Sequence, residues 1–215
     1  MLDRRALMLS AAALAVAPPA LAAAPQVLAD DMSLGNPKAK VQVIEYASVA
    51  CPHCAHFNET VLADFRKRWV DTGKVRFTLK EMLMASPTVA AAGFMLARCA
   101  GPGRYFKMVD EIYASQPRWE TGQIKPILQE IALANGLSEA QFNACLGDEK
   151  AQAGVNERMR RALDDDGVGA TPTVFVNGRK LDPTPATPAE MDAAITAALK
   201  AAGPAHKPAK KKGAR

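Results

Sequence analysis

Short apolar runs of the β type flank a longer amphipathic segment in the first third of the chain. Residues 40–47 (Lys-Val-Gln-Val-Ile-Glu-Tyr-Ala) and residues 74–80 (Lys-Val-Arg-Phe-Thr-Leu-Lys) are predicted to be strands, with residues 32–39 forming a turn before the first. Between the strands, large apolar residues recur every four positions, which predicts a helix that ends near Gly73: Phe57, Val61, Phe65 and Trp69. Strand, helix and strand in this order form a βαβ unit.

The ninety positions from 81 to 170 show almost no strand signal. Caps, glycines and apolar spacing predict five helices in this segment: one that begins at Pro87 and ends before Gly101, then 104–115, 121–135, 138–145 and 149–163. A sixth helix, 189–201, is predicted near the end of the chain. A βαβ crossover needs only about a dozen residues. The length of this segment therefore predicts an inserted helical subdomain with a core of its own.

A β-hairpin is predicted after the helical segment. Residues 173–176 and 179–181 are strand-like, and Asn177-Gly178 between them is a favoured two-residue turn. Pro172 cannot donate to a strand ladder, so it belongs at the start of the first strand. A tight cis turn is one solution there, and the sequence leaves the isomer open.

The motif that carries chemistry, Cys51-Pro52-His53-Cys54, lies where the first strand gives way to the helix. Two cysteines on the first helical turn can close a small disulfide and leave the Cys51 sulfur over unpaired N–H groups at the positive end of the helix dipole. Pro52 suits the first helical position because it has no N–H to leave unpaired, and a protonated His53 adds positive charge beside the sulfur. The motif predicts a redox-active dithiol whose potential these two residues tune.

Two other uses of the motif stay open. A soft metal could take Cys51, Cys54, His53 and His56, but the chain has a single Cys-x-x-Cys, and His56 lies about half a turn past Cys54. An inert structural disulfide is the other use. Because the motif stands between a strand and a helix, redox chemistry is favoured, and we expect neither a bound metal nor another cofactor.

The first residues have the three parts of a secretory signal peptide. Arg4 and Arg5 precede an apolar stretch, residues 6–17, that is too short to span a membrane, and small residues follow it. Residues 1–23 are therefore assigned to the signal, with cleavage near Ala22 to Ala24. The two arginines weakly resemble a twin-arginine signal, so the export route is open. We expect a periplasmic protein.

The net charge of +5 comes from the ends of the chain. The signal contributes one positive charge and the residues after 200 contribute five, which leaves −1 for the body. The basic segment 203–215 is too poor in apolar residues to fold and is predicted to be a flexible tail. The high pI therefore does not indicate a nucleic-acid-binding surface.

Cys99 and Cys145 make the cysteine count an even four. Disulfides persist outside the cytosol, and both residues lie in helix-like segments with apolar neighbours. A structural bridge between two helices is the favoured interpretation, and a pair of buried free thiols is the alternative.

Together these parts resemble the DsbA-like thiol:disulfide oxidoreductases of the thioredoxin superfamily. The resemblance covers about residues 34–200 and rests on three features: Val-Ile-Glu-Tyr-Ala-Ser-x-x-Cys-Pro-His-Cys, the helical insert, and Gly-Val-x-x-Thr-Pro-Thr-x-Phe-Val-Asn-Gly. It implies an α/β, thioredoxin-like fold formed by residues 34–80 and 171–200, with an inserted all-helical subdomain at residues 81–170. The chain is also similar to a branch of this family that has an extra disulfide in its helical domain.

The resemblance assigns roles to single residues. Cys51 would be the attacked and attacking sulfur and Cys54 the buried resolving one, while Ala170, Thr171 and Pro172 would hold an extended substrate in a cis-proline loop. Glu45 matches the family's buried acid and would exchange protons with Cys54, with Lys80 as its possible partner. The alternative is that Glu45 faces solvent on a half-buried strand.

One departure from the family pattern bears on the direction of the reaction. The commonest oxidase has valine before the cis-proline, whereas Thr171 here is typical of the isomerase and reductase branches. The resemblance implies a monomeric periplasmic oxidase that donates its disulfide to reduced or unfolded exported proteins and is reoxidised by a DsbB-like membrane quinone reductase. The alternatives are a disulfide isomerase or reductase, and an exported metal-binding protein.

Overall fold

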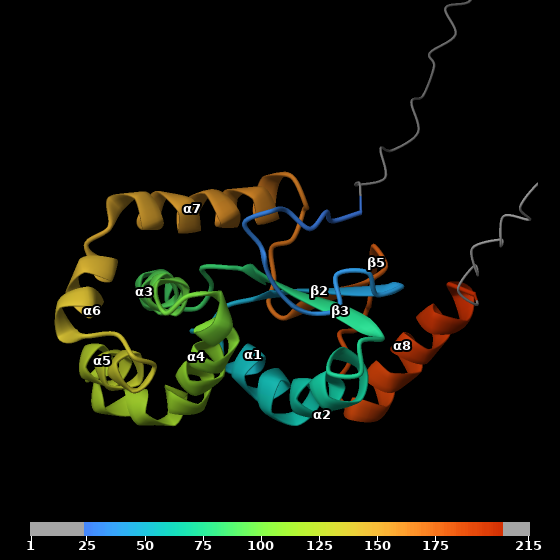
Figure 1. Cartoon of the computed structure of the whole chain (residues 1–215), viewed down its shortest axis with the longest axis horizontal. Coiled ribbons are helices and arrows are strands. Elements are labelled where there is room, and N and C mark those ends of the chain that lie inside the picture. The colour runs from blue at the N-terminus through green and yellow to red at the C-terminus, as the bar shows by residue number, and fades with distance from the viewer. Residues whose placement is uncertain (1–23, 204–215) are drawn as a thin grey trace, which may run out of the picture.

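A five-stranded mixed sheet is the centre of the computed structural model, which describes residues 24–203 (Figure 1). The predicted signal peptide and residues 204–215 of the predicted tail lie outside this range. The strand order is β1-β3-β2-β4-β5. Strands β2 and β3 are parallel and the other neighbours are antiparallel. The strands are β1 (Met32–Gly35), β2 (Val41–Ala47), β3 (Val75–Glu81), β4 (Thr173–Val176) and β5 (Arg179–Lys180).

The connection between β2 and β3 confirms the predicted βαβ unit. It is helical from Pro52 to Val70 and contains two π-helical stretches: α1 (Pro52–Phe57), η1 (Asn58–Leu62), α2 (Ala63–Phe65) and η2 (Arg66–Val70). An α-helix has about 3.6 residues per turn, so a stripe with a spacing of four residues drifts around it. The wider π turns offset that drift, and this keeps Phe57, Val61 and Phe65 buried on one face.

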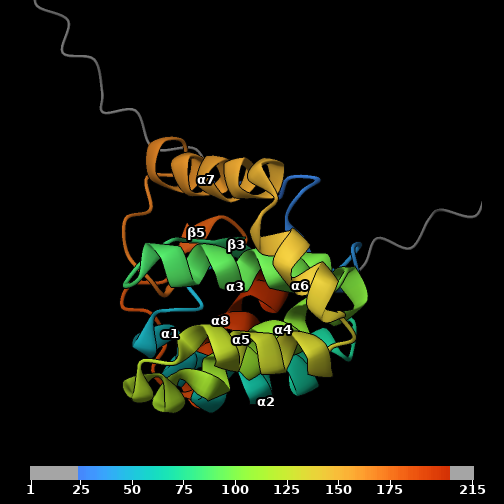
Figure 2. The ribbon, with the colours of Figure 1, turned by 90° about the vertical axis from the view of Figure 1, so that its left-hand side faces the viewer.

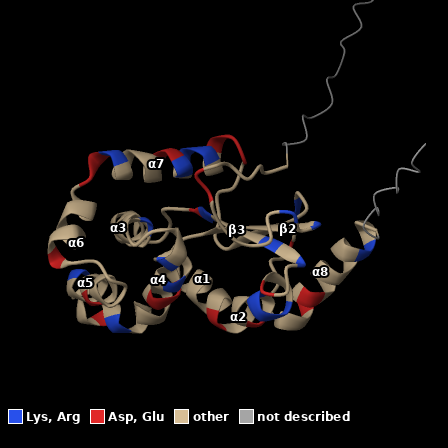
Figure 3. Cartoon of the chain, viewed as in Figure 1, with Lys and Arg blue, Asp and Glu red and all other residues tan. Residues whose placement is uncertain are grey.

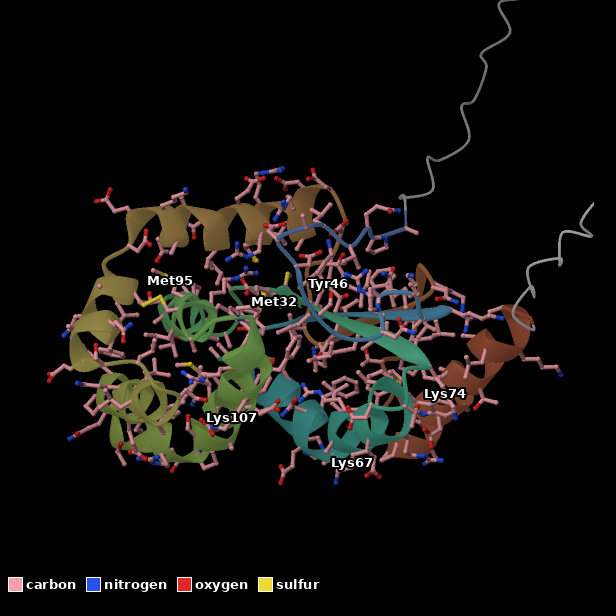
Figure 4. The ribbon with its side chains drawn as sticks, in the orientation of Figure 1. Met32, Tyr46, Lys67, Lys74, Met95 and Lys107 are labelled. Atoms are coloured by element: carbon pink, nitrogen blue, oxygen red, sulfur yellow. A yellow bond between two sulfur atoms is a disulfide. The ribbon has the colours of Figure 1, made fainter. Side chains whose placement is uncertain are left out.

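Helices cover both faces of the sheet (Figure 1). Helix α8 (Pro188–Ala201) packs with the β2–β3 connection on one face, against Val43 and Ala47. Helix α7 (Glu149–Asp164) lies over the opposite face, where Ile44 and Tyr46 point. Figure 4 shows Tyr46 on the α7 side of the sheet and Lys67 on the far side. Because both faces are covered, β2 is buried almost throughout.

The predicted helical insert lies between β3 and β4. It consists of α3 (Pro87–Cys99), α4 (Pro102–Ser115), the 3₁₀ segment η3 (Gln116–Thr121), α5 (Ile124–Ala134), α6 (Glu139–Leu146) and α7. Figure 2 shows α7, α3 and α5 one below another, and α3 contacts all the other α-helices of the insert. Apolar residues of the insert and of the sheet form one continuous buried cluster. The insert therefore shares its core with the sheet, and the prediction of a core of its own is wrong.

Two local predictions have different outcomes. The hairpin of β4 and β5 is confirmed, with Asn177 and Gly178 at φ +48° and +78°, as a type I′ turn requires. Residues 32–39 were expected to be a turn, but Met32–Gly35 form β1, which pairs antiparallel with β3. This edge strand is short and only half-buried, so its residues carry little periodic signal.

Charged residues of both signs are interspersed over the described ribbon, as Figure 3 shows for α7. None of the helices within residues 24–203 combines the length and the apolar character that are needed to cross a membrane.

A disulfide joins α3 to α6 through Cys99 and Cys145, whose Cα atoms are 6.3 Å apart. The two residues are 46 positions apart, so the bridge closes a long loop of the unfolded chain. We expect Cys99→Ala/Cys145→Ala to lower the free energy of unfolding by about 2–4 kcal/mol. Urea unfolding in a Cys51→Ala/Cys54→Ala background measures the contribution of this disulfide alone, because the active-site cysteines are then absent.

A reductant provides the control for this experiment. It should destabilise the protein that keeps Cys99 and Cys145 to the level of the variant, and it should leave the variant unchanged. Equal stability of the two proteins without reductant would contradict a stabilising role for the bridge.

Candidate active site

The dithiol stands at the carboxyl end of β2. Cys51 has extended backbone angles, φ −87° and ψ 120°, and directly precedes α1, with Pro52 as the first helical residue. Its N–H donates to the Ser48 carbonyl at 3.0 Å, which closes the turn between strand and helix. Gln116 from η3 donates to the carbonyls of Val49 at 2.9 Å and Cys51 at 3.3 Å. The helical insert thus holds the backbone of the loop that carries the nucleophile.

The Cys51 sulfur is surrounded by donors. The thiol of Cys54 hydrogen-bonds to it and lowers the pKa of Cys51 to about 5, against the opposite effect of burial. The side chain of Thr171 and the N–H groups of Cys54 and His53 lower the pKa of Cys51 further. The N–H groups of His53 and Cys54 belong to the first helical turn, where they have no partner within the helix. They account for the predicted stabilisation of a thiolate at Cys51.

Cys54 has the opposite environment. It is fully buried, whereas Cys51 keeps 6% of its surface exposed. Its hydrogen bond to Cys51 raises the pKa of Cys54 above the ordinary thiol range, and burial and the charge of Glu45 act in the same direction. At neutral pH the reduced site therefore holds a thiolate at Cys51 and a thiol at Cys54.

The loop before β4 lies opposite the dithiol. The Thr171–Pro172 peptide bond is cis, and the Cys51 sulfur lies 3.7 Å from the Thr171 carbonyl oxygen, to which it donates when it is protonated. Thr173 and Thr184 hold the loop from inside, because their hydroxyls donate to the carbonyls of Ala170 and Pro172 at 2.8 and 3.1 Å. Ala170 is exposed and Thr171 half-buried, so the loop faces solvent beside the sulfur.

Lys80 does not partner Glu45 as expected. It lies on the α7 side of the sheet, where its ammonium is 3.2 Å from Asp166 and 3.6 Å from Asp31. Tyr46 also donates to Asp166 at 2.7 Å. Neighbouring residues of a strand point to opposite faces, and Lys80 pairs with Tyr46, not Glu45, across the strands. These contacts anchor Asp166, which follows the end of α7 and lies five residues before Thr171.

Glu45 is buried, with 1% of its surface exposed, so the alternative of a solvent-facing side chain is wrong. Burial raises the pKa of Glu45 to about 8; the charge of Arg66 acts against this, and the charges of Asp110 and Cys51 add to it. A carboxyl group with such a pKa is protonated at neutral pH and is able to exchange a proton near Cys54.

The two histidines near the dithiol differ from its sulfurs in exposure. His53 and His56 are both exposed. Within the described part of the chain, no three His, Cys, Asp or Glu side chains are grouped closely enough to hold a metal ion. The four-ligand arrangement of Cys51, Cys54, His53 and His56 is therefore not formed.

Four residues near the site were not predicted from the sequence. Gln116 holds the active-site loop, and the others line an open pocket of about 1000 Å³ beside α1: Arg66, Asp110 and Tyr113. Pro52 and His56 line the same pocket, so it adjoins the dithiol helix. No local pattern distinguishes these four from ordinary surface or core residues, because only the packing of α4 and η3 against the β2–β3 connection brings them together.

Comparisons with known proteins agree with this geometry. The thioredoxin family model matches residues 28–197. A Rickettsia conorii protein named for protein-disulfide oxidoreductase activity is 31% identical over 151 residues, which cover 69% of this chain and 54% of that protein. Disulfide bond formation protein D of Bacillus subtilis is 23% identical over 149 residues, covering 68% and 67% of the two chains. The chain thus spans about half the length of the Rickettsia relative.

The fold has close counterparts among solved structures. The crystal structure of Wolbachia pipientis alpha-DsbA1 superposes with a TM-score of 0.75 at 25% sequence identity, and the match covers 82% of this chain and 94% of that one. The structure of oxidised BdbD from Bacillus subtilis superposes with a TM-score of 0.70 at 22% identity. The latter likeness concerns the fold alone.

Proposed function

The chain belongs to the thioredoxin family, and from this premise we propose that it is a thiol:disulfide oxidoreductase that donates its Cys51–Cys54 disulfide to other proteins. The observation that carries the proposal is the asymmetry of the two sulfurs. Cys51 is held as a thiolate with a pKa of about 5 and keeps 6% of its surface exposed, whereas Cys54 is a fully buried thiol.

The asymmetry sets the direction of the reaction. A substrate thiolate attacks the Cys51 sulfur, the Cys51–Cys54 bond breaks, and Cys54 leaves and takes up a proton. A second substrate thiolate then attacks the substrate sulfur of the mixed disulfide, and Cys51 leaves as a stable thiolate. The substrate has lost two electrons and the protein has gained them. Because the reduced form is stabilised, the disulfide form is a strong oxidant.

The remaining site residues have roles in the same scheme. Glu45 supplies the proton that Cys54 takes up and regains it from solvent. Residues Ala170, Thr171 and Pro172 hold an extended substrate beside the Cys51 sulfur by strand addition. Pro52 and His53 complete the helical turn that presents this sulfur.

The substrates that fit this site are reduced or unfolded exported proteins in the periplasm. Support for export comes from the signal-like sequence of residues 1–23, which predicts cleavage near Ala22 to Ala24. A DsbB-like membrane protein would return the reduced dithiol to the disulfide. We propose that the protein acts as a monomer.

A disulfide isomerase or reductase is the second candidate, because the residue before the cis-proline is Thr171, which resembles those branches of the family. Such an enzyme works from the reduced state, so its dithiol must hold its electrons less readily than an oxidase does. The Thr171 side chain acts in the opposite direction, since it lowers the pKa of Cys51 and thereby stabilises the reduced form.

The equilibrium with glutathione tests the proposal. Mass spectrometry of the peptide that carries Cys51 and Cys54 excludes the other cysteine pair from the count. A dithiol that stays reduced in mildly oxidising buffer supports disulfide donation. One that is already oxidised in strongly reducing buffer would indicate a reductant.

The pH dependence of this equilibrium has an expected sign. The lowered pKa of Cys51 stabilises the reduced form of the protein. This stabilisation is complete at pH values above the ordinary thiol pKa of 9.0, and it is lost as the pH falls through about 5. Between these values, reduction by two glutathione thiols releases one proton. The equilibrium constant for reduction should therefore rise about tenfold per pH unit from pH 6 to 8.

A short peptide of residues 48–57 is the matched control, because its cysteines keep ordinary pKa values. Its equilibrium constant should not change with pH between 6 and 7.5. A folded protein that behaved like the peptide would contradict a thiolate at Cys51.

A further inference from the structure

Four buried side-chain atoms have no hydrogen-bond partner within residues 24–203. They are both carboxyl oxygens of Glu45, Nε of Arg66 and the hydroxyl of Tyr113. Buried polar atoms are nearly always hydrogen-bonded, either to protein groups or to ordered water. Their concentration in three side chains points to one polar partner that these side chains share.

Two observations place the three side chains together behind the dithiol. The Arg66 guanidinium lies over the ring of Phe77, 5.6 Å from its centroid, and Phe77 shares a sheet face with Glu45. Arg66 acts on the pKa of Glu45, and Glu45 and Cys54 both act on the pKa of Tyr113, so the groups are within electrostatic reach of one another. Glu45 of β2, Arg66 of η2 and Tyr113 of α4 thus form a group of polar side chains within reach of one another, which we call the polar region.

This polar region adjoins the pocket beside α1. Arg66 and Tyr113 line that pocket, with Asp110, whose carboxylate is 2.7 Å from Arg66. Tyr113 is 4% exposed and the Arg66 side chain 16% exposed. Two of the three side chains that carry unpaired buried atoms therefore line the pocket.

We propose that Tyr113 is a positioning residue that holds a water molecule between its hydroxyl, Arg66 and the Glu45 carboxyl, and that protons pass between Glu45 and the pocket through this water. The inference rests on the proposed role of Glu45 in disulfide donation. The hydroxyl and Nε both donate, the carboxyl donates or accepts, and water has complementary groups for all three.

The proton balance follows the reaction. When substrate thiolate breaks the Cys51–Cys54 bond, Cys54 takes the proton of the Glu45 carboxyl and leaves a buried carboxylate. The bridging water then gives that carboxylate a proton and is itself reprotonated from the pocket. During reoxidation the same path runs in reverse, and Cys54 loses its proton to the pocket. No electrons pass along this route.

The groups whose charges act on this region come from every element around it: Glu45 in β2, Cys51 and Cys54 at α1, Arg66 in η2, and Tyr105, Asp110 and Tyr113 in α4. Burial raises the pKa of Tyr113 well above its ordinary value, so its hydroxyl keeps its proton throughout the working pH range. It therefore acts as a fixed donor, and Glu45 is the group that titrates.

Tyr113→Phe in the mature full-length chain tests the proposal, because it removes the hydroxyl and keeps the ring. The measurement is the single-turnover rate at which oxidised protein oxidises a reduced two-cysteine peptide, from pH 5.5 to 9, in H₂O and in D₂O. We expect a rate about tenfold lower at pH 7 and a larger solvent isotope effect than in the wild type. In a Glu45→Gln background the same substitution should change neither quantity.

Tyr105→Phe is the matched control. Tyr105 is also a buried tyrosine of α4 whose charge acts on Tyr113, but its hydroxyl already has a partner, because it donates to Glu81 at 2.8 Å. This variant should keep the wild-type pH profile and isotope effect. Equal effects of both substitutions would overturn the proposal, since they would mark a general response to loss of a buried hydroxyl.

Asp110→Asn gives a second test on a side chain that is 38% exposed. It removes a charge that raises the pKa of Glu45 and leaves Arg66 uncompensated, so the pH profile should shift to lower pH. An unshifted profile, or a Tyr113→Phe protein that matches the wild type at every pH, would overturn the inference. A wild type that oxidises no peptide would instead refute the proposed function.

Discussion

A Cys51→Ser protein is expected to lose thiol–disulfide exchange completely. A serine hydroxyl is not ionised at neutral pH and forms no disulfide, so the donors around position 51 have no thiolate to stabilise. Cys54→Ser should behave differently. It keeps the Cys51 thiolate, which attacks a disulfide-bonded peptide, but it lacks the resolving thiol, so the mixed disulfide should accumulate. Intact-mass measurement after incubation with a disulfide-bonded peptide distinguishes the two outcomes.

The second cysteine pair provides the control for these variants. Cys99→Ala/Cys145→Ala removes as many sulfur atoms as a Cys51→Ala/Cys54→Ala variant does, but from helices α3 and α6. It should exchange disulfides at the wild-type rate wherever it is folded. A Cys54→Ser protein that captured no peptide would contradict the assignment of Cys51 as the attacking sulfur.

Glu81→Gln is expected to cause a large loss of stability. The Glu81 side chain is fully buried, and its two oxygens accept from Arg98 at 2.6 Å and Arg158 at 2.5 Å. Tyr105 also donates to it at 2.8 Å. The site joins β3 to α3, α4 and α7.

Removal of this carboxylate leaves two mostly buried guanidinium groups without their counter-charge. Loss of one partner of a buried ion pair costs about 3–5 kcal/mol, and we expect a decrease in the free energy of unfolding in this range by urea titration. The matched control is Glu130→Gln, which breaks a surface pair with Arg118 and should leave stability almost unchanged because solvent screens that pair. Equal effects of the two changes would show that the Glu81 charge does not hold the insert to the sheet.

Much of the secondary structure could be predicted because its causes are local. Helix α6 begins with the capping box of Ser138 and Gln141, in which each side chain binds the other residue's backbone. The hairpin turn follows from the tolerance of Asn177 and Gly178 for positive φ. The dithiol could be located in the same way, since Cys51-Pro52-His53-Cys54 stands between a strand signal and a helix signal.

Partners across the fold could not be predicted. Lys80 was expected to face Glu45, but the alternation of strand side chains directs it to Asp31 and Asp166 on the other face. Strand β1 was not predicted, because its strand conformation depends on pairing with β3 and hardly on its own four residues. The helical insert was expected to have a separate core, yet its apolar faces pack into the core of the sheet.

The residues and their order along the chain specify which chemistry is available: a Cys-x-x-Cys at a helix N-terminus, an acid on the preceding strand and a proline before the last hairpin. How these groups act on one another depends on the fold. Burial of Glu45 and Cys54, the approach of Thr171 to Cys51, and the placement of Arg66 and Tyr113 along one pocket all depend on contacts between elements far apart in the chain. Protonation depends on desolvation and on neighbouring charges, and these are properties of the packed fold.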